Sequence, residues 1–294
     1  MPQYIRHLQG NTGKLFDKEK SNIPKNHLFF NPSVSKNIIY LRATINNQLD
    51  VNSYIVLYDI DKQVSHNIDS PNHIFEKNIN LYHGIEDLRI MHFNNKLWFT
   101  ATSTHASKVM NNELLIGYFD DSLNKIEKIQ IVDIKSLPVK NICPFVYENN
   151  LLLLDVYKKC IYKFSTTANA KFVATKYLDL KAMAGINFDS FKGSTSPVHL
   201  HGNIWGCVIH DVIYNDQGTT LPALSYLHYW MEFDVTTGEV IFLSSAFWLV
   251  HWGIEYVSGI HYDKDKDMVQ LFIGVNDNDA LLFQTTLWKL RVGK

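Results

Sequence analysis

The chain has 294 residues, of which 46% are hydrophobic and 13% aromatic, and this composition predicts a globular protein and excludes a disordered one. Lys and Arg total 28 and Asp and Glu 29, so the formal net charge of -1 gives no indication of a nucleic-acid partner. Three separated cysteines, Cys143, Cys160 and Cys207, argue against a disulfide scaffold. No run approaches the roughly 18 apolar residues of a membrane span, and no signal peptide is evident. We therefore expect a cytoplasmic protein without a membrane partner.

Short apolar or alternating runs, rather than helical periodicity, follow one another along the chain. Turn residues (Asn, Asp and Gly) separate these runs and favour tight antiparallel reversals. The strands that we predict lie, in chain order, at residues 37–44, 53–60, 96–103, 113–120, 151–157, 203–212, 229–234, 240–245 and 268–275. The predicted fold class is therefore all-β.

A polar cluster precedes each of five strand pairs. The clusters are FNPSV, GIEDLRI, KNICPF, KGSTSPV and GIEYVSGI, with Asn31, Asp87, Asn141, Ser194 and Glu255 as their marker residues. The spacings between successive marker residues are 56, 54, 53 and 61. A near-constant period with strand-turn-strand content is typical of four-stranded propeller blades. A two-sheet sandwich, the alternative, does not predict the regular return of polar clusters.

The repeat predicts a five-bladed β-propeller that forms a single domain over residues 1–294. Its five units account for the chain from about residue 28 to the end. We expect the first 27 residues to complete the last blade or to cover a rim. Because the innermost strands of all blades begin at the same face, the five polar clusters should converge around one central pocket.

The second cluster offers a candidate catalytic acid, Asp87. A carboxylic acid at a pocket rim can protonate a leaving oxygen if its environment raises its pKa. Glu86 should point to the opposite face if the segment is extended, and Arg89 should lie on the side of Asp87. The alternative interpretation of this acid–arginine string is a plain surface salt bridge.

Other polar residues near the predicted pocket suit a sugar, whose hydroxyl groups both donate and accept hydrogen bonds. Asn31 and Arg42 lie in the first unit, and Asn276 and Asp277 follow a strand of the fifth. Five aromatic residues could stack on sugar faces, although we expect most of them to lie in the core: Trp98, Tyr226, Trp230, Trp248 and Trp252.

Two patterns that resemble metal sites do not satisfy their requirements. Asp263, Asp265 and Asp267 resemble the first half of a calcium loop, but the glycine and the glutamate that complete it are missing. His199 and His201 share one face of a strand, but no third ligand is evident nearby. We therefore expect no metal site.

The motifs together resemble glycoside hydrolase family 130, the β-mannoside phosphorylases and hydrolases. GIEDLRI resembles the family's Glu-Asp-Pro-Arg signature, with Leu88 in place of the proline. FNPSV with YLRA, GSTSPV with VIHDV, IEYVSGI and GVNDNDA are similar to further segments of that family, in the same order. KNICPF and the later clusters are closer to a branch often found beside glycosyltransferases. The resemblance covers about residue 28 to the end and implies a five-bladed β-propeller.

The resemblance implies a role for several residues. Asp87 aligns with the catalytic acid, which acts on the glycosidic oxygen directly or through a sugar hydroxyl. Asn31, Arg42 and Asp277 align with residues that hold the sugar whose bond is broken. The expected substrate is therefore an oligosaccharide or glycoside.

The resemblance also implies how the second reactant binds. Lys192 and His210 lie near positions that contact phosphate, so inorganic phosphate is the one co-substrate expected, and no other cofactor is. An arginine expected after the second blade's strand is not evident, since that segment offers only His105 and Lys108. In a hydrolase, a carboxylate must instead activate water, and Glu255 is the candidate.

Further residues are expected to line the substrate pocket: Arg89, Asn141, Ser194, Tyr226 and His228. Two classes of function remain open. One is an inverting phosphorylase, hydrolase or related mannosyltransferase acting on β-linked mannosides or similar glycans. The other is a catalytically inactive propeller that binds a glycan or a partner enzyme.

Overall fold

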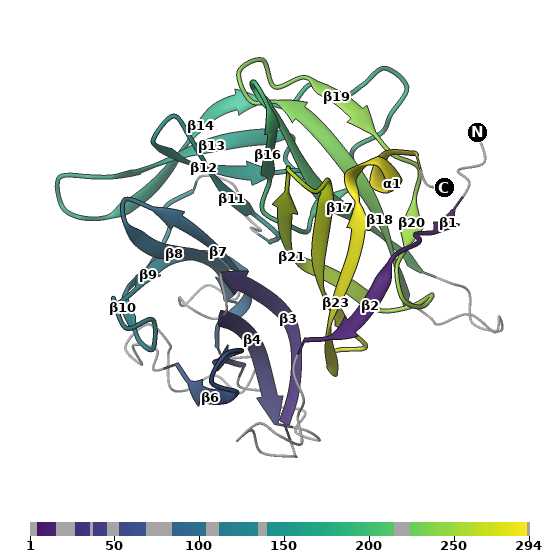
Figure 1. The fold of residues 1–294 in the computed structure, drawn as a ribbon. Coiled ribbons are helices and arrows are strands. Elements are labelled where there is room, and N and C mark those ends of the chain that lie inside the picture. Colours follow the sequence, from purple (N-terminus) through teal and green to yellow (C-terminus); the bar gives the residue numbers. More distant parts are fainter. Residues whose placement is uncertain are drawn as a thin grey trace.

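In the part of the chain that the structure describes, five β-sheets surround a central axis (Figure 1). The computed structural model describes residues 5–15, 27–35, 38–45, 53–68, 84–103, 112–134, 140–214 and 224–292. Within these residues the single helix is α1 (Leu287–Val292), which follows the last strand. No helix in this part of the chain has the length and apolar character needed to cross a membrane. The prediction of an all-β propeller is confirmed.

Four of the sheets have four antiparallel strands each within the described residues. The first contains β3 (His27–Ser35), β4 (Ile38–Ile45), β5 (Tyr54–Asp59) and β6 (Val64–Asn67). The second contains β7 (Glu86–Phe93), β8 (Lys96–Ser103), β9 (Glu113–Phe119) and β10 (Ile126–Ile131). The third contains β11 (Cys143–Tyr147), β12 (Asn150–Asp155), β13 (Cys160–Thr166) and β14 (Phe172–Asp179). The last contains β21 (Glu255–Asp263), β22 (Met268–Val275), β23 (Asp279–Thr286) and β2 (Asn11–Lys14).

The fourth sheet along the chain is larger than the expected blade and has seven strands. Its long central pair is β17 (Ile204–Tyr214) and β18 (Leu224–Asp234). On the inner side, β17 also pairs with β15 (Lys192–Gly193) and β16 (Val198–His201). On the outer side, β18 pairs with β19 (Val240–Leu243) and β20 (Phe247–Trp248), and β20 pairs with β1 (Arg6–His7). The expectation of five equal four-stranded blades therefore holds for four sheets and not for this one.

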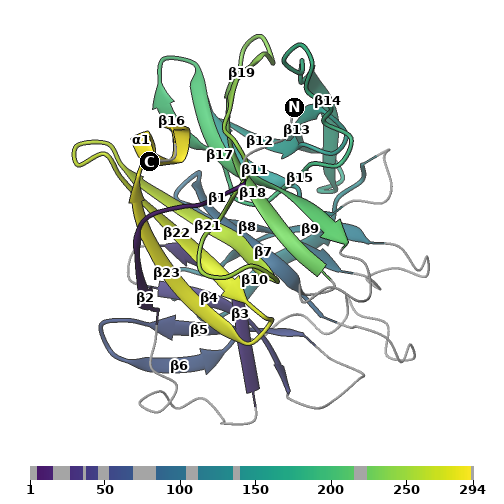
Figure 2. The same ribbon diagram turned by 90° about the vertical axis from the view of Figure 1, so that its right-hand side faces the viewer.

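The N-terminal segment closes the ring. Strand β2 pairs antiparallel with β23, and the two run side by side in Figure 2. Arg6 then donates two hydrogen bonds from its guanidinium to the carbonyl oxygens of Lys289 and Leu290, at 2.9 and 2.7 Å. These contacts tie the N-terminal segment to α1, which follows the last strand.

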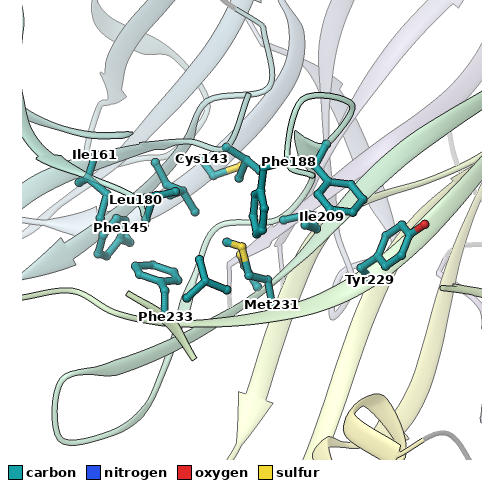
Figure 3. Packing of buried hydrophobic residues seen from close by; sticks show 14 of the residues in the cluster. Cys143, Phe145, Ile161, Leu180, Phe188, Ile209, Tyr229, Met231 and Phe233 are labelled. Atoms are coloured by element: carbon teal, nitrogen blue, oxygen red, sulfur yellow. The ribbon is translucent and has the colours of Figure 1, made fainter. Parts of the chain in front are cut away.

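Hydrophobic side chains fill the spaces between neighbouring sheets. Between the third and fourth sheets, Phe145 and Ile161 face Ile209, Met231 and Phe233 (Figure 3). Similar clusters lie between the other neighbouring sheets. Since both faces of each sheet are covered, the middle strands read as continuous apolar runs, such as the four leucines of β12. This packing holds the inner strands close to the axis.

Candidate functional site

Three sheets carry a polar residue with a left-handed backbone at the same place. Asn31, Asp87 and Asn141 have φ of 50°, 52° and 61°. Asn and Asp adopt this conformation more readily than most residues. At Asn31 and Asp87 the backbone turn interrupts the strand register, which shifts between Phe30 and Ser33 and between Glu86 and Arg89. The sequence repeat is thus a repeat of backbone geometry.

Asn31 and Arg42 meet at the carboxylate of Asp87. Asn31 donates a hydrogen bond from Nδ2 to Oδ1 of Asp87 at 2.7 Å. Nη1 of Arg42, on β4, lies 3.5 Å from the same oxygen. Nε of Arg42 donates to Oγ of Ser53 at 2.9 Å, which fixes the direction of the guanidinium. Asp87 itself is only 5% exposed.

Glu86 belongs to the same group of charges, and the prediction that it points away from Asp87 is wrong. Oε1 of Glu86 lies 3.1 Å from Nη2 of Arg42, so one guanidinium contacts both carboxylates. Strict alternation applies to regular extended strands. The left-handed backbone of Asp87 breaks that alternation and brings the two neighbouring side chains to the same cation.

The three carboxyl groups of the site differ in proton affinity. Burial raises the pKa of Asp87, but Arg42, Lys140, Arg89 and the hydrogen bond from Asn31 outweigh it and hold the pKa below its ordinary value. Burial raises the pKa of Glu86 above its ordinary value, although Arg42 opposes this.

Asp277 completes this group from the turn after β22. Its side chain is exposed, but the protein atoms around it limit its hydration, and this desolvation raises its pKa against the attraction of Arg42. The negative charge of Asp87 also raises the pKa of Asp277. Asp87 is thus the most acidic of the three.

Arg89 ties four sheets together at the axis. Its Nε donates to the carbonyl oxygen of Ser194 at 2.8 Å, and its Nη1 donates to the carbonyl oxygen of Asp87 at 2.9 Å. Its Nη2 donates to the hydroxyl of Tyr256 and to Oδ1 of Asn141. With 2% of its surface exposed, Arg89 supports the site from behind and is not placed to bind a sugar as expected.

The fifth cluster presents Tyr256, not Glu255, to the axis. The Tyr256 hydroxyl donates to Oδ1 of Asn141 at 3.0 Å, beside Arg89. Sequence reasoning missed Tyr256. Alternation along β21 would have indicated that Glu255 and Tyr256 point to opposite sides.

Glu255 instead anchors a loop. It is fully buried, and its carboxylate accepts hydrogen bonds from the backbone N–H groups of Leu249, Val250 and His251, at 2.6, 2.9 and 3.4 Å. Burial raises its pKa, although these bonds oppose the shift. The geometry gives Glu255 the role of a loop anchor, and the expectation that it activates water finds no support.

His228 lies behind the site with Glu255. Its side chain is 0% exposed, and its Nε2 is 3.6 Å from Oε1 of Glu255. Burial lowers the pKa of His228 to about 3, so its ring is neutral at neutral pH. The expectation that His228 contacts substrate is therefore wrong, because no part of its side chain reaches the surface.

The residues expected to bind phosphate lie together on the fourth sheet. Lys192 and His210 are direct partners in the β15–β17 pairing. Nδ1 of His210 is 2.8 Å from Oγ of Ser194, and burial lowers the pKa of His210 well below its ordinary value. His210 is thus a neutral group at this place.

A cavity of about 470 Å³ adjoins these residues. Lys192 lines it together with Lys140 and Asn141, and three carboxylates, those of Asp155, Asp189 and Asp211, line it as well. Lys140 was missed in the sequence, although it directly precedes Asn141 in the third cluster. Its charge acts on Asp87 and on His210, so it links the carboxylates with the predicted anion site.

Tyr226 is the aromatic residue that the structure places best for a sugar. It is half-buried, and its ring centroid lies 5.4 Å from that of His210 and 6.2 Å from that of Tyr256. Burial and the charges of Asp277 and Asp87 raise its pKa.

No group of three or more His, Cys, Asp or Glu side chains among the described residues could hold a metal ion. Asp263 forms an exposed ion pair with Lys266 at 2.8 Å, and His199 contacts Lys264. His105 and Lys108, which occupy the segment where an arginine was expected, lie outside the described residues.

Solved structures share this fold. A mannose phosphorylase from Leishmania mexicana, in complex with phosphate ion, has a TM-score of 0.62 and 13% identity over 97% of this chain and 90% of its own. A GDP-Man-dependent mannosyltransferase from Leishmania mexicana has a TM-score of 0.59 and 15% identity, covering 95% and 90%. A β-1,2-mannobiose phosphorylase from Listeria innocua, in complex with β-1,2-mannobiose, has a TM-score of 0.59 and 12% identity, covering 91% and 93%.

No protein-family model and no curated protein sequence matches the chain. At such low identity, the similarity to solved structures establishes the fold alone. The function must be argued from the site.

Proposed function

We propose that this chain is an inverting carbohydrate-active enzyme of the family 130 type, which acts on β-linked mannosides or similar glycans with Asp87 as general acid. The observation that carries the proposal is the convergence of Asn31 and Arg42 on the Asp87 carboxylate, to which the charge of Asp277 is electrostatically coupled. Amide, guanidinium and carboxylate groups in one place suit the hydroxyl groups of a sugar. The likeness to mannoside-processing enzymes adds support at the level of fold.

In this proposal, Asp87 gives its proton to the glycosidic oxygen, directly or through a sugar hydroxyl. The bond between the anomeric carbon and that oxygen breaks, and its electron pair stays with the leaving group. The second reactant attacks the anomeric carbon from the opposite face. A bound sugar covers the 5% of Asp87 that is still exposed and so adds to the burial that already acts to raise the pKa of its carboxyl group.

Inorganic phosphate is the second reactant that the residues favour over water. Lys140 and Lys192 are two cations that line one cavity, and His210 pairs with Lys192 beside it; because Asp155, Asp189 and Asp211 line the same cavity, a phosphate would have to bind against the two lysines. Glu255, the residue expected to activate water, is fully buried behind the site. We therefore favour phosphorolysis over hydrolysis.

A glycan-binding propeller without turnover is the second candidate function. The lowered pKa of Asp87 favours it, because an ionised carboxylate accepts hydrogen bonds from sugar hydroxyls but has no proton to donate. The two candidates predict the same ligand class and differ in whether a bond is broken.

Product analysis separates the candidates. The protein is incubated with a panel of β-linked manno-oligosaccharides and with sugar nucleotides, each with and without millimolar phosphate. We expect a sugar 1-phosphate of inverted anomeric configuration, and only when phosphate is present. Free sugar without phosphate would indicate a hydrolase, and transfer from a sugar nucleotide would indicate a transferase. Glycan binding by calorimetry without any product would establish the second candidate.

A further inference from the structure

We propose that Glu86 is a positioning residue for this reaction: it shares Arg42 with Asp87 and so helps Asp87 to keep the proton that it donates. The inference rests on the proposed function of Asp87. It concerns a residue that the resemblance assigns no role, and that sequence reasoning placed on the opposite face of the strand.

The geometry of Arg42 carries this inference. Nη2 of Arg42 lies 3.1 Å from Oε1 of Glu86, whereas Nη1 lies 3.5 Å from Oδ1 of Asp87. The guanidinium is thus divided between two carboxylates, and Glu86 has the shorter contact. The side chains of Arg42, Glu86 and Asp87 are 16%, 8% and 7% exposed, so water screens these charges weakly.

The charged groups around Glu86 and Asp87 determine whether Glu86 strengthens or weakens the binding of a proton by Asp87. Arg42 from β4, Lys140 before β11 and Asp277 after β22 act on Glu86, besides Asp87 itself. The same two cations act on Asp87, and Asp87 is also faced by Arg89 on its own strand and by Asn31 from β3. Ionised Glu86 is therefore the negative neighbour that competes with Asp87 for Arg42.

Removing the charge of Glu86 should make Asp87 a stronger acid. Without Glu86, Arg42 pairs with Asp87 alone, and a like charge beside Asp87 disappears. Both changes stabilise the ionised form of Asp87 and lower its pKa. At neutral pH, a smaller fraction of the enzyme then carries the proton needed for catalysis.

The test is the Glu86→Gln variant, which keeps the size of the side chain. We expect turnover at neutral pH to fall about three- to tenfold, since a shift of one pKa unit changes the protonated fraction tenfold. The limb of the pH–rate profile on which turnover falls as pH rises should move to lower pH, and turnover should recover in more acidic buffer. Glu127→Gln, which removes an exposed carboxylate paired with Lys96, is the matched control and should change neither quantity.

Carbon NMR titration of the Asp87 carboxyl group, assigned by comparison with Asp87→Asn, tests the same inference without turnover. We expect the Asp87 pKa to be lower in Glu86→Gln than in the wild type. An unchanged Asp87 titration would overturn the inference, as would a loss of turnover equal at every pH, which would give Glu86 a purely structural role. If the wild type turns over no glycan, the proposed function fails, but the titration still decides how Glu86 acts on Asp87.

Discussion

At the residue scale, Asp87 combines two unfavourable features: a left-handed backbone and a carboxylate removed from water. A left-handed conformation costs roughly 1–2 kcal/mol for an ordinary L-residue, and less for Asp or Asn. The cationic partners of Asp87 offset the burial of its charge. Strained and buried polar residues of this kind cluster at functional sites, which supports placing the reaction at Asp87.

The neutral His228 behind the site makes stability depend on pH. Its pKa is about 3 in the folded protein, whereas an unfolded histidine titrates near about 6.5. Between these values the unfolded chain binds a proton that the folded protein excludes, so stability is lost as pH falls from about 6.5 towards 3. We expect His228→Gln, measured by denaturant unfolding at pH 4 to 6, to reduce this loss by about 1.4 kcal/mol per pH unit.

The exposed His66 provides the control for this measurement. His66→Gln should leave the pH dependence of unfolding as it is in the wild type, because His66 is not buried. Equal slopes in the wild type and in His228→Gln would show that His228 takes up its proton in the folded protein.

Individual site residues were predictable from sequence where a polar residue interrupts an apolar strand pattern. Asn31, Asp87 and Asn141 all follow this pattern, and their side chains meet the site. Glu86 and Glu255 were placed wrongly for two physical reasons. Glu86 was misplaced because the left-handed backbone at Asp87 cannot be recognised from the pattern of hydrophobic residues. Glu255 was misplaced because the sequence does not distinguish a buried carboxylate that accepts hydrogen bonds from backbone N–H groups from a catalytic carboxylate.

At the element scale, β22 approaches β3 so closely that Gly274 has no room for a side chain. A Cβ at this position would lie 2.5 Å from Oδ1 and 2.8 Å from the backbone nitrogen of Asn31. Asn31 is in turn the hydrogen-bond donor to Asp87. The glycine therefore lets the last sheet and the first sheet meet at the site.

Gly274→Ala should push Asn31 away from Asp87. We expect a loss of about 1–3 kcal/mol in the free energy of unfolding, as for other overpacked positions, together with lower turnover. Gly13→Ala, on the exposed strand β2, is the control, because a Cβ there meets nothing within 4 Å. Equal stability of the two variants in denaturant unfolding would contradict this, since it would show that Asn31 moves aside without lowering the free energy of unfolding.

The middle strands were predictable, and the outer strands, apart from β19, were not. Each predicted segment overlaps an observed strand, because strands covered on both faces are rich in apolar residues. The outer strands β6 and β14 are largely exposed and carry polar side chains, so neither alternation nor an apolar run marks them. β6 and β14 are strands because they pair with β5 and β13, and the residues of β6 and β14 alone give no information about this pairing.

At the scale of the whole molecule, the ring of sheets brings residues that recur at a regular spacing in the sequence to one site. Marker residues 53 to 56 positions apart come together because each sheet returns its inner strand to the axis, and in the fifth cluster Tyr256 takes the place of the marker Glu255. Arg89 then joins the second, third, fourth and fifth clusters through Asp87, Asn141, Ser194 and Tyr256. The seven-stranded sheet was not predictable, because β20 pairs with β1 at the other end of the chain.

Turnover by the wild type and by Asp87→Asn, compared on a glycoside that the wild type processes, tests the central claim most directly. Asparagine keeps the shape of the side chain and its capacity for hydrogen bonds, but it has no proton to give. General acid catalysis contributes on the order of 10² to 10⁴ in rate, so we expect turnover to fall at least about a hundredfold while calorimetry still detects sugar binding. Equal turnover in the two proteins would contradict the account and leave Asp87 as a partner in an ion pair only.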